Sequence, residues 1–352
     1  MDTSSINRIL TGHRPTGPRH IGHLVGTLRT WAELQAKYDC IFLVADLHVL
    51  TTDYTQPDAV RQNIVEVVTD WLAAGIDPDR STLALQSAVP EHSQLTLLLG
   101  MLTTVSRLER VPTYKEQIQA LSLQPSHGLL TYPVLQAADI LIYRADAVPV
   151  GEDQLPHIEL TRELARRFNT LYGFTFPEPQ SILSTMPRLP GLDNRTMHTS
   201  YGNQIYLKDT PEETTRKVMS MYTDPTRLRA TDPGHVEGNP VFTYLDSFDP
   251  DRAGVEDLKE RYRAGGVGDV EVKRHLANVL NAALAPLRER RKQFEAHPGQ
   301  VLEILREGTR RARPIAQETL GDAMQKMGLS LALDLYADPQ QPEQHVLRGA
   351  FC

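Results

Sequence analysis

A chain of 352 residues is too long for one compact hydrophobic core, and its length predicts two domains. Its 40% hydrophobic and 23% charged residues exclude a wholly disordered chain, and its net charge of -7 excludes a generally basic nucleic-acid coat protein. The two cysteines, Cys40 and Cys352, provide neither a disulfide framework nor a zinc site of spaced cysteines. This use of cysteine fits a reducing cytoplasm. No apolar run reaches membrane-spanning length, so we expect a soluble protein without a membrane contact.

The first functional signal is the stretch LTGHRPTGPRHIGHLVGTL, from Leu10 to Leu28. A short apolar run at Ile9 and Leu10 predicts a strand, and the apolar spacing after His23 predicts a helix, so the glycine-rich turn lies between them. Such a turn brings backbone N–H groups and cationic side chains to the positive end of the helix dipole, where phosphate binds. We therefore expect a nucleotide here.

Strand and helix patterns alternate in the next part of the chain. Residues 40–51 (CIFLVADLHVLT) form an apolar run of strand length whose polar end carries Asp46 and His48. Residues 57–75 have the proline start, apolar spacing and glycine end of a helix, and residues 81–87 predict another short strand. This alternation predicts an α/β fold with a Rossmann-type doubly wound parallel sheet, whose ligands bind at the carboxyl ends of the strands. The alternative roles are a core histidine for His48 and a cap for Asp46.

Residues 94–120 are predicted to be helical and are apolar on more than one face. This pattern indicates deep burial or a contact with a second subunit, and we expect a dimer contact there. Residues 128–139 (GLLTYPVLQAAD) precede a strand-like segment at 140–151. Residues 152–169 predict a helix whose acidic start and basic end suit its dipole.

The second half of the chain is predicted to be mostly helical. Residues 178–203 form a proline-rich loop that we expect to close one side of the site. At Thr210 the sequence TPEE combines an N-cap, a first-turn proline and a glutamate three residues on, which is a capping box. Residues 269–328 predict two long helices joined around Pro298 and Gly299.

Residues 271–330 contain more Lys and Arg than Asp and Glu, although the whole chain is acidic. Arg306, Arg310 and Arg313 recur on one predicted helical face. A run of this kind is usually a solvated face, and the alternative is a surface that follows the phosphates of RNA. The preceding helix carries a second cluster, made of Arg288, Arg290, Arg291 and Lys292.

Four blocks together resemble the tryptophanyl-tRNA synthetases of class I. They are RPTG followed by HIGH at 20–23, GLLTYPVLQAADILIY, VPVGEDQLPHIELTRELARRFN, and LPGLDNRTMHTSYGN. The similarity covers about residues 9–328 in the family's order. It implies a Rossmann catalytic domain at 1–205 with a helical insertion at about 94–175, a helical anticodon-binding domain at 206–335, and a tail at 336–352.

The resemblance also implies a homodimer that activates L-tryptophan with ATP and transfers it to tRNA(Trp). The tryptophan carboxylate attacks the α-phosphorus of ATP while pyrophosphate leaves, so catalysis is mostly alignment and neutralisation of phosphate charge. Mg²⁺ is expected only as the ion carried by ATP, and no structural metal is expected.

His20 and His23, one helical turn apart, can donate hydrogen bonds to phosphate oxygens, and Gly22 lets the adenine approach the backbone. A zinc pair or helix-end packing is the alternative for the two histidines. Gly151 and Asp153 match positions that contact the ATP ribose. The expected ATP-binding set is Gly12, Arg14, His20, Gly22, His23, Gly151, Asp153, Met197, Thr199 and Ser200. The expected catalytic residues are His20, His23, Arg14 and Arg195.

On the amino-acid side, the resemblance implies that Tyr132, Gln136 and Gln154 hold the ammonium and carboxylate of tryptophan. Asp139 matches the position that accepts the indole N–H, a donor-only group. An aspartate that begins an apolar strand is otherwise usually a cap. His48 is assigned to the same side of the site.

Two departures from the family pattern affect these expectations. The second signature, usually KMSKS, is TMHTS at residues 196–200, so both lysines that would stabilise the leaving pyrophosphate are absent. We hypothesise that activity survives at a lower rate, with Arg14 and Arg195 supplying part of the missing charge. Thr113 stands where relatives often carry glutamine, which leaves amino-acid contacts from that loop open.

Two other functions remain possible from the sequence. One is a tyrosine-specific sister synthetase, since an aspartate also accepts a phenol hydroxyl. The other is a non-charging paralogue that binds tryptophan and ATP as a sensor or partner protein, and the lysine-free loop favours it.

Overall fold

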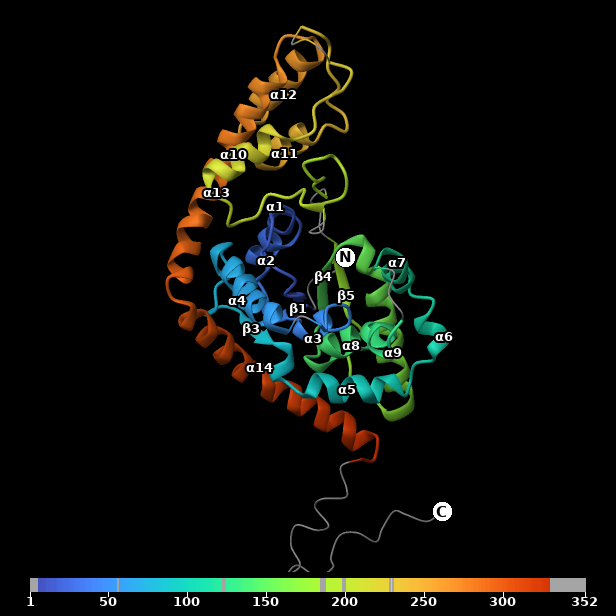
Figure 1. Cartoon of the computed structure of the whole chain (residues 1–352). Coiled ribbons are helices and arrows are strands. Elements are labelled where there is room, and N and C mark those ends of the chain that lie inside the picture. The colour runs from blue at the N-terminus through green and yellow to red at the C-terminus, as the bar shows by residue number, and fades with distance from the viewer. Residues whose placement is uncertain are drawn as a thin grey trace, which may run out of the picture.

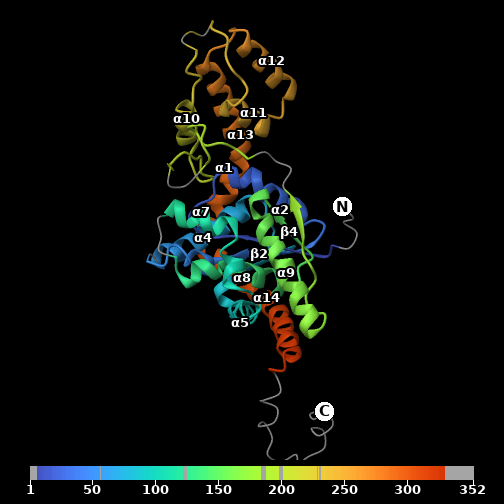
Figure 2. The ribbon, with the colours of Figure 1, turned by 90° about the vertical axis from the view of Figure 1, so that its right-hand side faces the viewer.

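The computed structural model describes residues 6–329 except 56, 122–124, 184–187, 198–200, 228 and 230. The predicted tail at 336–352 lies outside the described residues. Figure 1 shows a body built around the central sheet and a lobe of helices at one end, with two long helices running along one side of both. In Figure 2 this lobe stands above the sheet, and the last helix emerges below it.

The central sheet confirms the predicted fold class. Its strand order is β3-β2-β1-β4-β5, and all of its pairings are parallel. The order runs outward from β1 on both sides, so the topological switch point lies between β1 and β4, where open α/β sheets bind ligands. The strands are β1 (Arg8–His13), β2 (Asp39–Val44), β3 (Thr82–Leu85), β4 (Ala147–Val150) and β5 (Gln180–Leu183).

Two predicted strands are too long. The strand expected at 40–51 ends at Val44, because Ala45 leaves the extended conformation and helix α3 (Asp46–Val49) follows. The strand expected at 140–151 begins only at Ala147, because its first residues continue helix α8 (His127–Ile142). The middle of α8 is buried on several faces, so its apolar run lacks the periodicity that distinguishes a helix from a strand.

Strand β5 was not predicted. It lies inside the segment expected to be a loop, at the edge of the sheet, and pairs with β4 from Ala147↔Gln180 to Val150↔Leu183. Its four residues are only partly buried or exposed and include two polar side chains. A short polar edge strand carries little pattern that distinguishes it from a loop.

The helices before β5 cover the sheet and surround its carboxyl edge. The helix predicted at 57–75 is confirmed as α4, whereas the helical stretch at 94–120 is divided into three helices. Thr104 begins the second of these, because its hydroxyl accepts the Arg107 N–H at 3.3 Å. The bounds are α1 (Ile21–His23), η1 (Leu24–Leu28), α2 (Arg29–Leu34), α4 (Pro57–Ala73), η2 (Gln86–Ala88), α5 (Glu91–Gly100), α6 (Val105–Leu108), α7 (Pro112–Leu121), η3 (Glu152–Gln154) and α9 (Leu155–Tyr172).

The helices after β5 include the predicted capping box and the two long helices. The Thr210 hydroxyl accepts the Glu213 N–H at 3.1 Å, and the Glu213 carboxylate accepts the Thr210 N–H at 2.9 Å. This reciprocal pair begins α10 as expected. The bounds are α10 (Pro211–Met219), α11 (Pro240–Phe248), α12 (Arg252–Arg263), α13 (Asp269–Glu295) and α14 (Pro298–Lys326).

Helix α14 returns to the sheet and covers its edge strand β3. A Cβ atom on Gly308 would lie 2.0 Å from the Leu83 carbonyl oxygen, so only glycine permits this approach. The Thr309 hydroxyl accepts the Leu85 N–H at 3.0 Å, which pairs a backbone donor of the edge strand. The last helix of the predicted anticodon-binding domain therefore packs on the central sheet. The division at 205/206 stays a prediction.

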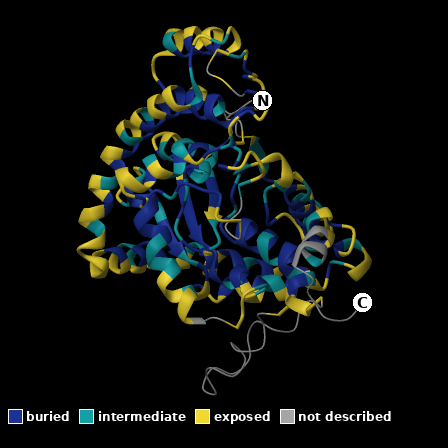
Figure 3. Cartoon of the chain, turned by 45° about the horizontal axis from the view of Figure 1, so that its top comes forward, coloured by how far each residue is buried: buried dark blue, intermediate teal, exposed yellow. Residues whose placement is uncertain are grey.

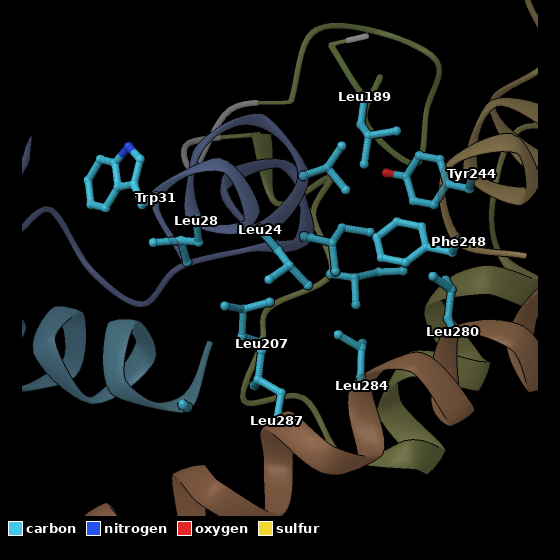
Figure 4. Packing of buried hydrophobic residues seen from close by; sticks show 14 of the residues in the cluster. Leu24, Leu28, Trp31, Leu189, Leu207, Tyr244, Phe248, Leu280, Leu284 and Leu287 are labelled. Carbon is cyan, nitrogen blue, oxygen red and sulfur yellow. The ribbon is translucent and has the colours of Figure 1, made fainter. Parts of the chain in front are cut away.

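Buried residues fill the sheet and the inner faces of the helices, whereas the long helices expose their outer faces (Figure 3). One buried hydrophobic cluster joins the start of the chain to the helical lobe (Figure 4). In it Leu24 and Leu28 lie close to Leu207, and Leu284 and Leu287 of α13 approach from the other side. The helix after the glycine-rich turn is thus packed against the helical region.

Cys40, the cysteine within the described residues, is buried and free, and burial raises the pKa of its thiol to about 12. It is therefore protonated and unreactive at neutral pH. Within the described ranges, no helix has both the length and the apolar character needed to cross a bilayer.

Candidate active site

A cavity of about 1150 Å³ opens beside the switch point, where β1 and β4 end. It brings together most of the residues expected from the sequence. Arg195 is not one of the described residues that line the cavity, and Thr199 and Ser200 lie outside the described residues. The expected residues that line the cavity are Gly12, Arg14, His20, Gly22, His23, His48, Tyr132, Gln136, Asp139, Gly151, Asp153, Gln154 and Met197.

The glycine-rich turn is shaped by close backbone contacts. A Cβ on Gly12 would lie 2.1 Å from the Leu43 carbonyl oxygen, so this glycine is required by the pairing of β1 with β2. A Cβ on Gly22 would lie 2.9 Å from His20 Nδ1 and 3.1 Å from the sulfur of Met197. Met197 of the second signature therefore lies directly over the HIGH turn at residues 20–23.

The segment after the second signature also pairs with this turn. The Ile21 N–H donates to the Ile205 carbonyl at 3.0 Å, and the Leu207 N–H donates to the Arg19 carbonyl at 2.9 Å. The two signatures, far apart in sequence, are thus joined through backbone hydrogen bonds that flank His20.

The histidines of the HIGH turn are neutral. Burial and the positive charge of Arg19 lower the pKa values of His20 and His23, that of His20 to about 4. The backbone N–H of His20 donates to His23 Nδ1 at 3.3 Å, so the proton of the His23 ring is on Nε2. Each ring therefore offers one N–H donor to a phosphate and no positive charge at neutral pH.

His13 also lines the cavity and was not predicted as a site residue. Its Nδ1 accepts the Trp71 indole N–H at 3.1 Å, so its proton is on Nε2, which lies 3.2 Å from the Thr27 hydroxyl. Its ring stacks on Trp31 with a centroid distance of 4.5 Å. These partners come from three helices, and no local pattern in the sequence identifies them.

Two arginines supply the permanent positive charge of the cavity wall, and the described residues of this wall include no lysine. Arg14 Nη2 donates to the Thr52 hydroxyl at 2.6 Å, and its buried Nε has no hydrogen-bond partner among the described residues. Arg188 was not predicted. Its Nη2 donates to Asp153 at 3.1 Å, and it stands in the loop just ahead of the second signature.

Arg195 is oriented differently from the expectation. Its guanidinium pairs with Asp193 at 2.6 Å and lies over the ring of Tyr201, 5.0 Å from the ring centroid. In this arrangement its charge is already neutralised by a neighbouring carboxylate. Its role toward pyrophosphate stays a prediction that requires a change of side-chain conformation.

Asp139 lies inside α8 and is not at the start of a strand, so the expected alternative of a strand cap does not apply. His48 Nε2 lies 2.8 Å and His92 Nδ1 lies 2.7 Å from its oxygens, and the Gln86 amide donates to both oxygens at 2.8 Å. Burial opposes ionisation of this carboxyl, but the hydrogen bonds from His48 and His92 lower its pKa to about 2. The cavity floor therefore carries an ionised acceptor held by three side chains.

Gln86 and His92 are functional candidates that the sequence interpretation missed. They follow β3 in the chain, and nothing in the sequence associates the polar end of this strand with the block that contains Asp139. His92 Nε2 also lies 2.9 Å from the hydroxyl of Tyr143, which extends the network away from the cavity. The parallel order of β3 and β2 places these residues beside His48.

Thr113, expected on a loop, lies in the first turn of α7 and reaches the predicted amino-acid side. The Thr113 hydroxyl lies 2.5 Å from the Tyr132 hydroxyl and 2.8 Å from His157 Nε2. Burial, together with the neighbouring His48, lowers the pKa of His157 to about 4, so this ring is neutral. Nearby, the Gln136 amide donates to Gln154 at 3.4 Å, which brings two further predicted residues together.

Other charged residues have structural roles. Asp46 is not the N-cap of α3, which is Ala45, and its carboxylate accepts the backbone N–H of Ser87 at 2.9 Å. Arg306 and Arg310 are exposed and pair with glutamates one turn away, as on a solvated face, whereas Arg313 pairs with Glu91 at 3.3 Å.

The second basic cluster is mostly committed to packing. Arg291 is buried against acidic residues of α4, and Arg290 Nε donates to the Ala73 carbonyl at 2.7 Å. Arg288 donates to the Thr214 hydroxyl at 2.7 Å. These three arginines hold α13 to its neighbours, and their clustering does not by itself indicate RNA binding.

A sequence model of the family described as tRNA synthetases class I (W and Y) matches residues 3–285. A tryptophan–tRNA ligase of Treponema pallidum is 50% identical over 327 residues, which covers 92% of this chain and 97% of the relative. The corresponding ligase of Aquifex aeolicus is 42% identical over 393 residues and covers 92% and 100%.

Solved structures agree with these relatives. The crystal structure of tryptophanyl-tRNA synthetase from Campylobacter jejuni complexed with ADP and tryptophan has a TM-score of 0.82 at 34% identity and covers 92% of this chain and 100% of that one. A tyrosyl-tRNA synthetase from Archaeoglobus fulgidus complexed with L-tyrosine has a TM-score of 0.65 at 25% identity, with 82% and 91% covered.

Proposed function

Because the chain belongs to the class I tRNA synthetases for tryptophan and tyrosine, we propose that it activates L-tryptophan with ATP and transfers it to tRNA(Trp), releasing AMP and pyrophosphate. The activity is that of a tryptophan–tRNA ligase, the name shared by relatives at 42 and 50% identity over nearly the whole chain. The observation that carries this function in the structure is the position of Asp139, which lines the cavity with its carboxylate held by His48, His92 and Gln86. A carboxylate is an acceptor-only group and suits the donor-only indole N–H.

The proposed amino-acid side consists of Asp139, His48, Tyr132, Gln136 and Gln154. In this arrangement Asp139 accepts the indole N–H, while the hydroxyl of Tyr132 and the amides of Gln136 and Gln154 line the same cavity and hold the ammonium and carboxylate. A phenylalanine in the same position would leave a buried carboxylate without one of its donors, which disfavours that substrate.

The proposed ATP side consists of the HIGH turn, Gly151, Asp153 and the loop around Met197, with Thr199 and Ser200 in that loop. His20 and His23 donate N–H groups to phosphate oxygens, and Asp153 accepts a ribose hydroxyl. For Asp153 to do so, the ion pair with Arg188 loosens, which frees that arginine for the phosphates. Mg²⁺ enters on the triphosphate, because phosphate and water oxygens are its preferred ligands.

The missing lysines leave the leaving pyrophosphate dependent on arginines. Arg14 and Arg195 are proposed to supply part of this charge, and the structure adds Arg188 as a third candidate. We expect Arg195→Ala to lower the rate of adenylate formation in single-turnover assays by about tenfold. An unchanged rate would exclude Arg195 from this role and leave Arg14 and Arg188.

Tryptophan-dependent exchange of pyrophosphate into ATP tests the first half-reaction, with tyrosine as the competing substrate. We expect exchange with tryptophan and at least 100-fold less with tyrosine, in line with a site built around one hydrogen-bonded group. Exchange with tyrosine alone would overturn the assignment. No exchange with either would favour the non-charging paralogue. Charging of tRNA(Trp) is measured separately, with the exchange-competent protein.

A homodimer is proposed through helices α5 and α6. Their inner residues Leu95, Leu98 and Leu99 are buried in the core, whereas Leu97 and Met101 are 64 and 68% exposed, and Val105 is 58% exposed. An apolar outer face next to a buried inner face is typical of a subunit contact. Light scattering coupled to size exclusion should give twice the monomer mass, and Leu97→Glu combined with Met101→Glu should give the monomer.

A further inference from the structure

Asp70 of α4 is a fully buried carboxylate that lies between two distant parts of the chain. Its exposed fraction is 0%. One carboxylate oxygen accepts the backbone N–H of Arg19 at 2.6 Å, and the other pairs with the guanidinium of Arg291 on α13. The three residues form a continuous link from the glycine-rich turn through α4 to the long helix of the helical region.

The α13 end of this link is rigidly held. Arg291 is 2% exposed, and its Nη2 lies 2.6 Å from the carboxylate of Glu66. The neighbouring Arg290 donates to the carbonyl of Ala73 at 2.7 Å, so two successive arginines attach α13 to the same face of α4. Removing one member of a buried ion pair leaves an uncompensated charge, which makes the link sensitive to any change in the position of α13.

The other end of the link reaches the reacting region. Arg19 precedes His20, and its carbonyl accepts the Leu207 N–H at 2.9 Å, so both peptide groups of Arg19 are fixed from outside the turn. The Arg19 guanidinium donates back to the Gly17 carbonyl, and its charge helps to keep His20 and His23 neutral. The backbone position of Arg19 therefore determines where the N–H donors of the HIGH turn point.

We propose that Asp70 is a positioning residue for the ATP turn, and that through Arg291 it couples the orientation of the helical region to the geometry of the ATP site. The inference rests on the proposed function, because it assigns the HIGH turn to ATP. Asp70 touches neither substrate and acts through Arg19. Its role is separate from hydrophobic packing, which joins the same segments through Leu24, Leu28, Leu284 and Leu287.

The first test is Asp70→Asn, which keeps the shape but removes the charge and one acceptor oxygen. We expect the KM for ATP in pyrophosphate exchange to rise about tenfold and kcat to fall, while the KM for tryptophan stays within about twofold. The matched control is Lys273→Met, which removes another buried cation of α13, one whose ammonium donates to the carbonyls of Met219 and Met221 and to the Thr223 hydroxyl. The control should lower the melting temperature and leave both KM values unchanged.

The second test is a double-mutant cycle with Arg291→Met. If Arg291 acts through Asp70, the double variant should have the same KM for ATP as Asp70→Asn alone. Independent, additive effects would overturn the link, as would a lower melting temperature of Asp70→Asn without any change in the KM for ATP. Should Asp70→Asn fail to fold, Arg291→Lys, which keeps the charge but loses the fork geometry, is expected to give a smaller shift in the same direction.

Titration calorimetry with ATP separates failure of the link from failure of the proposed function. Absence of tryptophan-dependent exchange in the unmodified protein would contradict the function. The link is then judged from the ATP dissociation constant, which should still rise about tenfold in Asp70→Asn because the turn is displaced. An unchanged dissociation constant would overturn the link.

Discussion

The two sides of the cavity are held in different ways. On the amino-acid side, the acceptor Asp139 is 4% exposed and is fixed by His48, His92 and Gln86 from three separate segments. On the ATP side, the histidines are neutral, and the two arginines of the wall have side chains that are 35 and 72% exposed. Under the proposed function, selectivity is thus preorganised in a buried network, whereas the charge for pyrophosphate is carried by partly exposed side chains.

This difference predicts two kinds of sensitivity. A change on the amino-acid side removes a partner from a buried network, where each unpaired polar group is costly. A change on the ATP side removes one of several partly exposed charges. The loss of such a charge has a smaller effect on the rate, because solvent screens the charge and a neighbouring charge can compensate for it. The following predictions test this contrast, from the largest expected effect to the smallest.

Asp139→Asn should have the largest effect. The amide has one acceptor oxygen, and its NH₂ group faces the ring nitrogens of His48 and His92 in place of a carboxylate oxygen. We therefore expect kcat/KM for tryptophan in pyrophosphate exchange to fall by roughly 10²- to 10³-fold. Tyr143→Phe is the matched control, because it removes only the hydroxyl at the outer end of the network and should cost less than about tenfold. Full activity of Asp139→Asn would contradict the proposed indole acceptor.

Arg14→Ala should slow adenylate formation by about 10²-fold, because it removes the less exposed of the two arginines of the cavity wall. Arg188→Ala should slow it by about tenfold, since its guanidinium is more exposed and more strongly screened. Single-turnover formation of the adenylate measures both. Arg166→Ala on α9, whose arginine pairs with Glu159 away from the cavity, should leave the rate unchanged. Equal effects of all three variants would indicate a general loss of charge.

Restoring the lysines of the second signature should raise the rate. Thr196→Lys combined with Thr199→Lys adds two charges to the loop beside Met197 and should accelerate adenylate formation by about tenfold. The control pair, Thr196→Gln with Thr199→Gln, supplies side chains of similar length without charge. No gain from the lysines over the glutamines would show that the arginines already neutralise the pyrophosphate.

The smallest expected effect is on stability in acid. Burial, together with the charge of Arg19, lowers the pKa of His20 from its ordinary value of 6.5 to about 4, so the unfolded chain binds this proton more tightly. The stability that neutral His20 contributes is complete above pH 6.5 and is lost as the pH falls from 6.5 to 4. Melting temperatures measured between pH 7 and 4 should fall less steeply in His20→Asn. Identical slopes would mean that His20 is not held neutral.

The sequence by itself determined the features that depend on local chemistry and on the order of the blocks. The capping box at Thr210, the helix α4 and the two long helices follow from hydrogen bonds and periodicity within a few turns. The alternation of strands and helices fixed the parallel sheet, and with it the meeting of the HIGH turn and the Tyr132–Asp139 block at one edge.

Only the tertiary structure decided which side chains complete the site. Gln86, His92 and Arg188 reach the cavity or its network from segments whose local patterns carry no chemical signal. The start of 140–151 is helical, and the sequence did not show this because burial on several faces leaves no helical periodicity. Arg291 looked like part of a basic surface and is a buried partner of Asp70. Burial and pairing depend on contacts between residues far apart in the chain, and these are absent from any local window of sequence.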